Sequence, residues 1–125
     1  MIDIALRNDL INDANLNVSS VYPERLPQNT NATAIVYQIN NGFAKVQQGS
    51  NLTVVEHNVQ LDVYGTSYSD VRNLVSKLLT KYNGYAGGLD TLDVAGSYVR
   101  SVQHTFEDDT RLYRGILDIE LHVKF

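Results

Sequence analysis

Three histidines are the residues best able to do chemistry in this sequence, since an imidazole can ligate a metal or exchange a proton near neutral pH. They are His57, His104 and His122. No two of them stand four residues apart on a helix, and no His-Glu-X-X-His motif occurs. His57 falls on the apolar side of one alternating stretch and His122 on the polar side of another, so we do not expect the three to converge. We therefore predict no metal site.

The carboxylates and glycines form no catalytic pattern either. Asp108-Asp109 lies in a predicted turn, where Asp is common because it bonds to the local backbone. Asp118 and Glu120 lie on the solvated side of a predicted strand. The glycines of residues 84–88 follow a helix instead of preceding one, and no Gly-Lys-Ser/Thr comes after them, so they do not form a phosphate loop. The chain has no Gly-X-Ser-X-Gly motif and no cysteine, which excludes a nucleophile elbow, a disulfide and a thiolate site.

The composition describes a chain of 125 residues, 43% hydrophobic and 19% charged, which is the usual size of one domain, residues 1–125. The formal net charge is −4 and the Lys and Arg residues are scattered, so we predict no sequence-specific binding of nucleic acid. Eight tyrosines could stack on single-stranded bases, but no basic groove accompanies them. No apolar run approaches the roughly 18 residues of a transmembrane helix, so we predict no membrane partner.

The clearest single element is a helix that begins near Thr66 or Ser67. Asp70 follows Ser67 at the spacing of a capping box, with Asp in place of the usual Glu. An Asn-Gly pair at residues 83–84 ends the helix. One apolar stripe runs along it and needs a cover, which the predicted strands supply. This stripe consists of Tyr68, Val71, Leu74, Val75, Leu78, Leu79 and Tyr82.

Alternation of apolar and polar residues predicts the strands. From Val55 onward the alternation is strict, as in a sheet with one buried and one solvated face. The predicted fold class is therefore α+β: a mostly antiparallel sheet of about four or five strands, with a long helix packed on one face and a short N-terminal helix. The glycine-rich residues 84–96 are predicted as a loop, with a brief strand as the alternative. We expect the short helix over 1–14, strands over 34–39, 52–65, 97–107 and 112–125, and a weaker strand over 43–48.

Several weak local features in a fixed order carry a resemblance to a known family. After the N-terminal helix come Val21-Tyr22-Pro23-Glu24-Arg25-Leu26-Pro27 and Ala34-Ile35-Val36-Tyr37-Gln38-Ile39. Then follow Val59-Gln60-Leu61-Asp62-Val63-Tyr64-Gly65, Leu74-Val75-Ser76-Lys77-Leu78-Leu79 and the closing Glu120-Leu121-His122-Val123-Lys124-Phe125. In this order and spacing, nearly the whole chain resembles the tail terminator proteins of long-tailed bacteriophages, also called tail-completion or minor capsid proteins.

The resemblance implies a structural virion protein of the tail and neck region, made in the host cytoplasm. Such a protein forms a homo-oligomeric ring, usually a hexamer, that caps the tail tube, ends its polymerisation and joins it to the head. Its implied partners are further copies of itself, the major tail tube protein and the head-tail connector proteins, with DNA passing through the ring. The family implies no enzymatic activity and no cofactor. Because ring contacts usually come from loops and strand edges, we expect interface residues at Asn29, Asn31, Phe43, Lys45, Gln48, Tyr85, Leu89, Asp109 and Arg111.

Two alternatives remain open from the sequence. The first is a head-completion or neck protein of the same virion, which has a similar size and a similar lack of motifs. The second is a small α+β ligand-binding domain or enzyme, which needs a pocket with converging polar groups. His57 and His104 are the only candidates for such a pocket, because both can lie on strand faces that point toward the helix.

Overall fold

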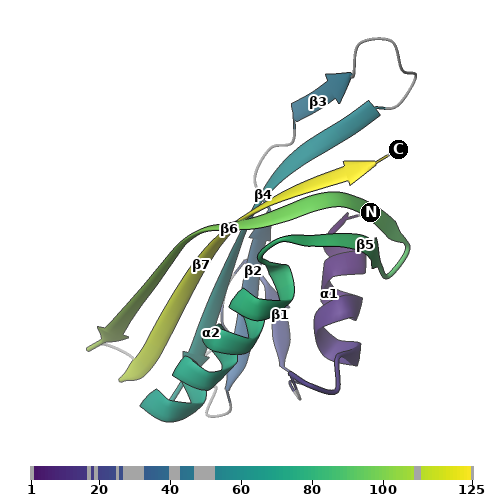
Figure 1. Ribbon diagram of the computed structural model, residues 1–125. Helices are drawn as coiled ribbons and strands as arrows, with labels where there is room; N and C mark the ends of the chain where they lie inside the picture. The colour runs from purple at the N-terminus through teal and green to yellow at the C-terminus, as the bar shows by residue number, and fades with distance from the viewer. Residues whose placement is uncertain are drawn as a thin grey trace.

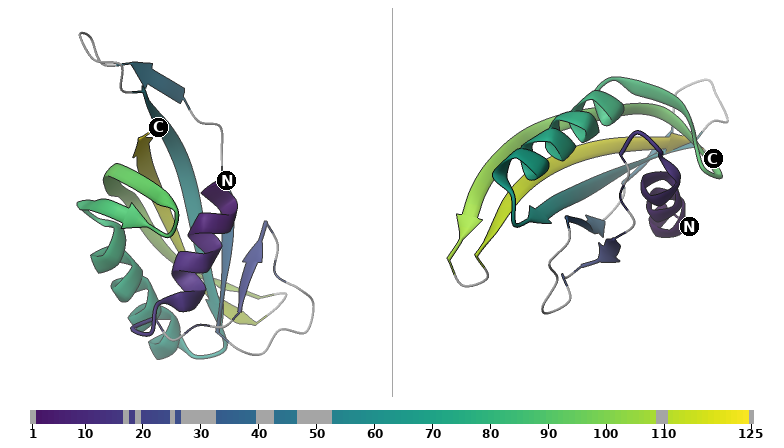
Figure 2. Two further views of the ribbon diagram at one scale, coloured as in Figure 1. Left: turned by 90° about the vertical axis from the view of Figure 1, so that its right-hand side faces the viewer. Right: turned by 90° about the horizontal axis from the view of Figure 1, so that it is seen from below.

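The computed structural model describes residues 2–16, 18, 20–24, 26, 33–39, 43–46, 53–108 and 111–124. Over these residues the chain forms two helices and a seven-stranded sheet that twists and curves strongly (Figures 1 and 2). Neither of these helices is long and apolar enough to cross a membrane. Both helices belong to the same hydrophobic core, so they cover one side of the sheet.

The sheet is mixed, and its strands follow the order β1-β2-β4-β7-β6-β5, with β3 paired to β4 as well. β1 runs parallel to β2, and every other pairing is antiparallel. β4, β7 and β6 are the longest strands and form the centre of the sheet. Their bounds and those of the others are β1 (Val21–Pro23), β2 (Ala34–Ile39), β3 (Phe43–Val46), β4 (Thr53–Gly65), β5 (Tyr85–Leu89), β6 (Leu92–Glu107) and β7 (Leu112–Lys124).

Helix α2 (Tyr68–Tyr82) begins where the sequence predicts. The Ser67 side chain accepts a hydrogen bond from the Asp70 N–H at 3.4 Å, which satisfies one of the free donors of the first turn. The helix lies against β7 and β4. It approaches β7 closely because Gly115 has no side chain: a Cβ there would overlap a methyl group of Val75.

Five residues of the predicted α2 stripe are buried: Val71, Leu74, Val75, Leu78 and Tyr82. The prediction is wrong for Tyr68 and Leu79, which are 50% and 37% exposed. Both lie at the flank of the helix that faces β6, where the sheet provides no further cover. This flank is therefore an apolar surface in an isolated copy.

Helix α1 (Ile2–Asn12) lies beside β1 and β5, on the same side of the sheet as α2 (Figure 2). Ala5, Leu6 and Leu10 are buried and join the core that α2 and the sheet enclose. The predicted N-terminal helix is thus present, with bounds slightly inside the expected ones.

The predicted fold class is wrong in three respects. The sheet has seven strands instead of four or five, it is mixed, and it makes up most of the described structure around an α2 of only 15 residues. The parallel edge strand β1 ends at Pro23, which is tolerated there because an edge strand leaves one row of N–H groups unpaired.

Residues 84–96, predicted as a loop or a brief strand, form β5, a tight turn and the start of β6, so the segment contains more strand than predicted. Gly84, Gly87 and Asp90 adopt positive φ angles that most side chains disfavour. These conformations let a glycine-rich segment turn sharply and then pair, so the low strand propensity of glycine is overridden by the pairing with β6.

Strand β6 continues far beyond its partner β5. Along β6, the last residue paired with β5 is Ser97, which lies opposite Tyr85. From Arg100 to Phe106, every residue of β6 is exposed. We call residues 100–107 of β6, together with the paired residues 112–118 of β7, the arm. Figure 1 shows it extending past the helices at the lower left.

Candidate functional site

The histidines do not form one site. His57 is paired with Leu121 across β4 and β7, whereas His104 is paired with Gly115 across β6 and β7. Six residues of β7 separate these two positions, which corresponds to about 20 Å along a strand. His57 is half-buried and burial lowers its pKa, while His104 is exposed. The pocket that an enzyme would need at His57 and His104 is therefore not formed.

His122 does have acidic neighbours that the sequence analysis missed. Its Nε2 atom lies 2.8 Å from Oε1 of Glu120, and ligand atoms of Glu56, Glu120 and His122 all lie within 4.8 Å of one another. Two carboxylates and an imidazole are a donor set that suits a divalent ion such as zinc. Arg100 also approaches Glu120, at 3.8 Å, so this carboxylate already has a cationic partner within the chain. In the sequence, only the spacing of Glu120 and His122 indicated this group. Glu56 is far away in the sequence and lies beside His122 because the two are paired across β4 and β7.

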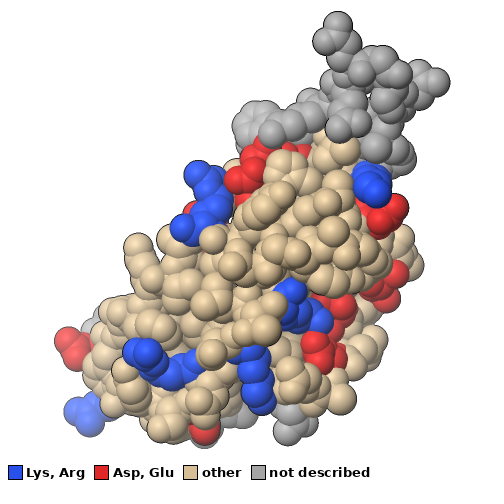
Figure 3. Space-filling model, viewed as in Figure 1, with Lys and Arg blue, Asp and Glu red and all other residues tan. Residues whose placement is uncertain are grey.

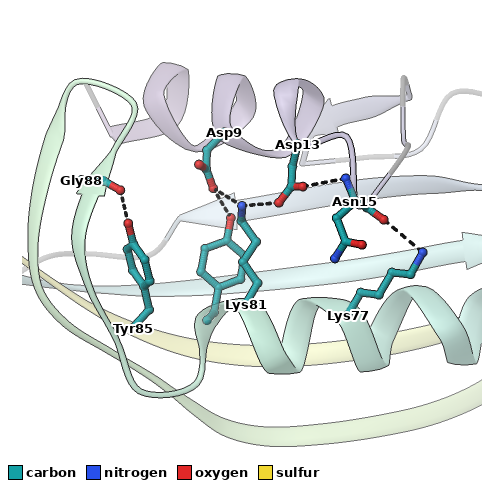
Figure 4. Close-up of polar contacts among 8 residues, drawn as sticks. Asp9, Asp13, Asn15, Lys77, Lys81, Tyr85 and Gly88 are labelled. Atoms are coloured by element: carbon teal, nitrogen blue, oxygen red, sulfur yellow. Dashed lines mark hydrogen bonds and ion pairs between the residues drawn. The ribbon is translucent and has the colours of Figure 1, made fainter.

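A second polar cluster joins α1 to α2 (Figure 4). Nζ of Lys81 lies 3.1 Å from Asp9 and 2.6 Å from Asp13, and the buried Tyr82 hydroxyl donates to Asp9 at 2.9 Å. One turn earlier, Lys77 donates to the backbone carbonyl of Asn15 at 3.0 Å. The cluster therefore holds the N-terminal helix against the core.

The pKa values in this cluster are those of a structural link. Burial opposes the charge on Lys81, but hydrogen bonds and charges from Asp13 and Asp9 outweigh it and raise the pKa of Lys81. The hydrogen bond from Lys81 lowers the pKa of Asp13. Burial, followed by the Asp9 charge, raises the pKa of the Tyr82 hydroxyl. At neutral pH none of these groups is poised to exchange a proton, as a catalytic acid or base would be.

Two hollows lie next to these contacts. One, of about 250 Å³, is bordered by Asp9, Asp13, Lys81 and Asp90, whose charges are largely paired with one another. The other, of about 350 Å³, lies between α2 and the residues Leu16, Val18 and Thr33. Among its described lining residues, only Asp70 and Lys77 carry charge. The described residues of neither hollow bring together a nucleophile, a base and an oxyanion donor.

The predicted interface residues are only partly described. Asn29, Asn31, Gln48 and Asp109 lie outside the described residues, and for Phe43 and Lys45 the structure gives the β3 backbone alone.

The other three predicted interface residues are placed. Tyr85 is half-exposed in β5, and its hydroxyl donates to the Gly88 carbonyl. Arg111 is exposed at the tip of the arm, with a positive φ. Leu89, in contrast, is 2% exposed and packs in the core. A role in contacts stays a prediction for these residues, and for Leu89 it requires access that this conformation does not give.

An exposed apolar surface lies where α2 and the arm meet. We call it the helix-side strip, and it begins with three aromatic rings in contact. Tyr68 and Tyr113 are edge to face at 5.5 Å between ring centres, and Phe106 lies 4.9 Å from Tyr113. Arg72 lies over the Tyr68 ring and donates to its hydroxyl at 2.9 Å. The strip comprises Tyr68, Arg72, Leu79, Val102, Phe106 and Tyr113.

Figure 3 shows the side of the molecule that bears α2 and the arm. A broad surface without charge covers much of it, and basic side chains lie along its lower part. Single exposed apolar residues are common on proteins, but a contiguous apolar surface marks an interaction site more often.

The opposite face of β4, β7 and β6 is polar, with mostly half-exposed side chains around a buried Asp62, and we call it the open face. Arg114 is its most extensively paired group: it contacts Asp62 at 2.6 Å and Glu107 at 3.2 Å, and lies over the Tyr64 ring. The side chains of this face come from alternate positions that are paired across the three strands. The charged members of its central part are Glu56, Asp62, Arg100, Glu107, Arg114, Asp118 and Glu120.

Comparisons with known proteins agree with this architecture. A family model described as tail completion protein gp17 matches residues 4–124. A chain of a solved structure titled "Virion of native gene transfer agent (GTA) particle" has a TM-score of 0.71 and 13% sequence identity. The match covers 99% of this chain and 95% of that one, which shows a shared fold. No curated protein sequence matches the chain.

Proposed function

We propose, for a chain that belongs to the tail completion protein gp17 family, that copies of it assemble into a ring that caps the phage tail tube. Family membership confirms the resemblance predicted from the sequence and makes the chain a structural protein of the virion, in the tail or neck region. The proposal adds that the ring, with six subunits, ends tube polymerisation and presents a surface to the head connector. It also holds that the protein catalyses no reaction.

The observation that carries the proposal is the family match over residues 4–124, almost the full length of the chain. The structure supports it through its surfaces. The described residues pair their buried polar groups within the chain for the most part, while a large apolar strip and one face of the sheet stay exposed. A protein that acts through contacts with other subunits needs such surfaces more than it needs a pocket.

Electron microscopy of particles assembled without this protein tests the proposed function. We expect tails of uncontrolled length and heads without attached tails, because nothing stops the tube or joins it to the head. Supplying the protein from a plasmid should restore tail length and attachment. Tails of normal length beside unattached heads would instead assign the protein to the neck, and normal particles would contradict both roles.

Light scattering on the purified protein, alone and mixed with tail tubes, tests the ring. We expect a closed oligomer, either in solution or on the tube end. A protein that remains a monomer under both conditions would contradict the ring.

A further inference from the structure

We propose that the helix-side strip of one copy packs on the open face of the next copy, with Arg72 of the first opposite Asp118 of the second. This interface rests on the proposed ring and identifies the two surfaces that build it. It makes each contact in the ring the same, with one side of the sheet always meeting the other side of its neighbour.

The strip provides the apolar part of the interface. Tyr68 is 50% exposed, Phe106 45%, and Leu79 and Val102 37% each. Val102 and Phe106 are four residues apart in β6, so their side chains lie on the same face of the strand. Tyr68 and Leu79 are eleven residues apart on α2, close to three full turns, so they lie on the same side of the helix. The four side chains therefore lie along one flank of the molecule. Clusters of exposed aromatic and aliphatic residues of this kind form the centres of protein interfaces.

The open face provides the complementary charge. Among the described residues, its central part carries five carboxylates and two arginines, so the net charge of this part is negative. Most of these carboxylates are already engaged, as Asp62 and Glu107 are by Arg114. Asp118 is different: it lies half-buried near the middle of the face, across from Gln60 and Ser101, and no described residue forms a hydrogen bond or ion pair with it.

Arg72 has the matching property on the strip. Its guanidinium lies on the Tyr68 ring and bonds to the Tyr68 hydroxyl, and no carboxylate of the described residues contacts it. Guanidinium groups form two parallel hydrogen bonds with a carboxylate and are common in interfaces. Each surface thus offers one charge that has no opposite charge among the described residues.

The placement of these surfaces also decides the symmetry. They lie on opposite sides of one sheet, so a contact between them joins unlike surfaces of successive copies. Such heterologous contacts generate rings or helical filaments, whereas a two-fold dimer would join like surfaces. A strip and a face on opposite sides of the sheet that meet through the Arg72–Asp118 pair therefore fit a ring better than an isolated dimer.

Charge reversal tests this pairing, with assembly measured by analytical ultracentrifugation and by electron microscopy of capped tubes. Arg72→Glu places two negative groups together and Asp118→Arg places two positive groups together. We expect each single variant to reduce ring formation at least tenfold, roughly the effect of like charges in an interface. The double variant R72E/D118R should restore assembly, because the pair is then present with its signs exchanged.

A mixture of the two single variants gives an independent result. In alternating order, the introduced glutamate of an R72E copy meets the introduced arginine of a D118R copy. The unaltered Arg72 of that D118R copy then meets the unaltered Asp118 of the next R72E copy. Every contact is complementary, so we expect the mixture to form rings although neither variant does so alone.

Arg7→Glu, an equal charge reversal on exposed α1, is the matched control and should assemble normally. Thermal unfolding of each variant shows whether it is folded. If R72E and D118R form rings as the unaltered protein does, or if R72E/D118R and the mixture both fail to recover, the pairing is overturned while the ring stands. If the unaltered protein and the Arg7 control form no ring, the proposed function itself fails. Variants that form rings but do not cap tubes would assign the strip to the tube protein and also overturn the pairing.

Discussion

At the scale of single residues, Lys81 makes the polar link that holds α1 to α2, beside the buried Leu6 and Leu10. From a half-buried position on α2, its ammonium group contacts two carboxylates: Asp9 within α1 and Asp13 directly after the end of α1. The sequence contains no pattern for this link, since Asp9 and Asp13 are separated from Lys81 by about seventy residues. Only the folded arrangement of the two helices brings them together.

Replacing Lys81 with Met should reduce the free energy of unfolding by about 1–2 kcal/mol at pH 7, because Asp9 and Asp13 lose a shared charged donor. Lys77→Met is the matched control, since Lys77 lies one turn earlier and bonds only to a carbonyl; we expect a change within about 0.5 kcal/mol. Urea unfolding measures both.

The effect of Lys81→Met should also depend on pH. The pKa of Asp13 in the folded protein lies below its ordinary value of 3.8, so the pair stabilises the fold above that value and loses this effect as the pH falls through the folded pKa. We therefore expect the difference between the unaltered protein and K81M to shrink below about pH 4. A difference that is the same at pH 3 and pH 7 would show that the Asp13 charge is not its source.

At the scale of elements, the sequence predicted what depends on a regular pattern. Helix α2 and its Ser67 cap follow from a stripe of apolar residues and a capping spacing, and β4 and β7 follow from alternation. It could not determine the structure that depends on pairing partners. Glycine-rich β5 has little strand propensity of its own and exists because β6 lies beside it, and the parallel partner of β1 is fixed only by the register Val21 to Ile35.

The same limit applies to sites. The sequence left His57 and His104 as candidates for a shared pocket, because both can lie on strand faces that point toward the helix. Their separation depends on the register positions Leu121 and Gly115 of β7, which the local pattern does not encode. The Glu56–Glu120–His122 group was not expected, because Glu56 reaches His122 through the β4–β7 register, which no local pattern encodes. The exposed state of Tyr68 and Leu79 was missed for a related reason: the stripe shows which residues are apolar but not where the sheet ends.

The close packing of α2 on β7 gives a prediction at this scale. Gly115→Ala adds one methyl group that would overlap the Val75 side chain, so the helix or the strand must move, and we expect a loss of about 1–3 kcal/mol. Gly88→Ala is the control, since a Cβ there meets nothing within 4 Å; it should change stability by less than about 0.5 kcal/mol. Equal melting temperatures for the two variants would contradict the tight helix–sheet contact.

At the scale of the whole molecule, stability and assembly should depend on different residues. The core lies between the helices and the sheet, whereas Val102 and Phe106 are exposed on the arm. Surface substitutions away from the core usually change stability by less than about 0.5 kcal/mol. The exposed side chains of the arm, Val102 and Phe106, are therefore available for contacts without belonging to the core.

Substituting Ser for both Val102 and Phe106 should leave the protein folded, at a cost of about 1–2 kcal/mol because Phe106 packs on the Tyr113 ring. It should weaken ring formation much more, as seen by light scattering over a range of concentrations. The control is Ile4→Ser, because Ile4 is 58% exposed on α1, outside the strip. Loss of assembly in both variants, or in neither, would mean that the arm is not a specific contact.

The unpaired edge of β6 also affects how the protein behaves before it assembles. Asn83 satisfies the Val99 N–H with its side chain at 3.3 Å, and past that point the described structure pairs no strand with this edge. Long unpaired strand edges of this kind can pair with strands of other chains and lead to fibrils. Here the ladder is irregular between Val99 and Ser101, with Arg100 at the irregularity, and both a bulge and a positive charge discourage indiscriminate stacking. We expect unassembled copies of the protein to resist amyloid-like aggregation.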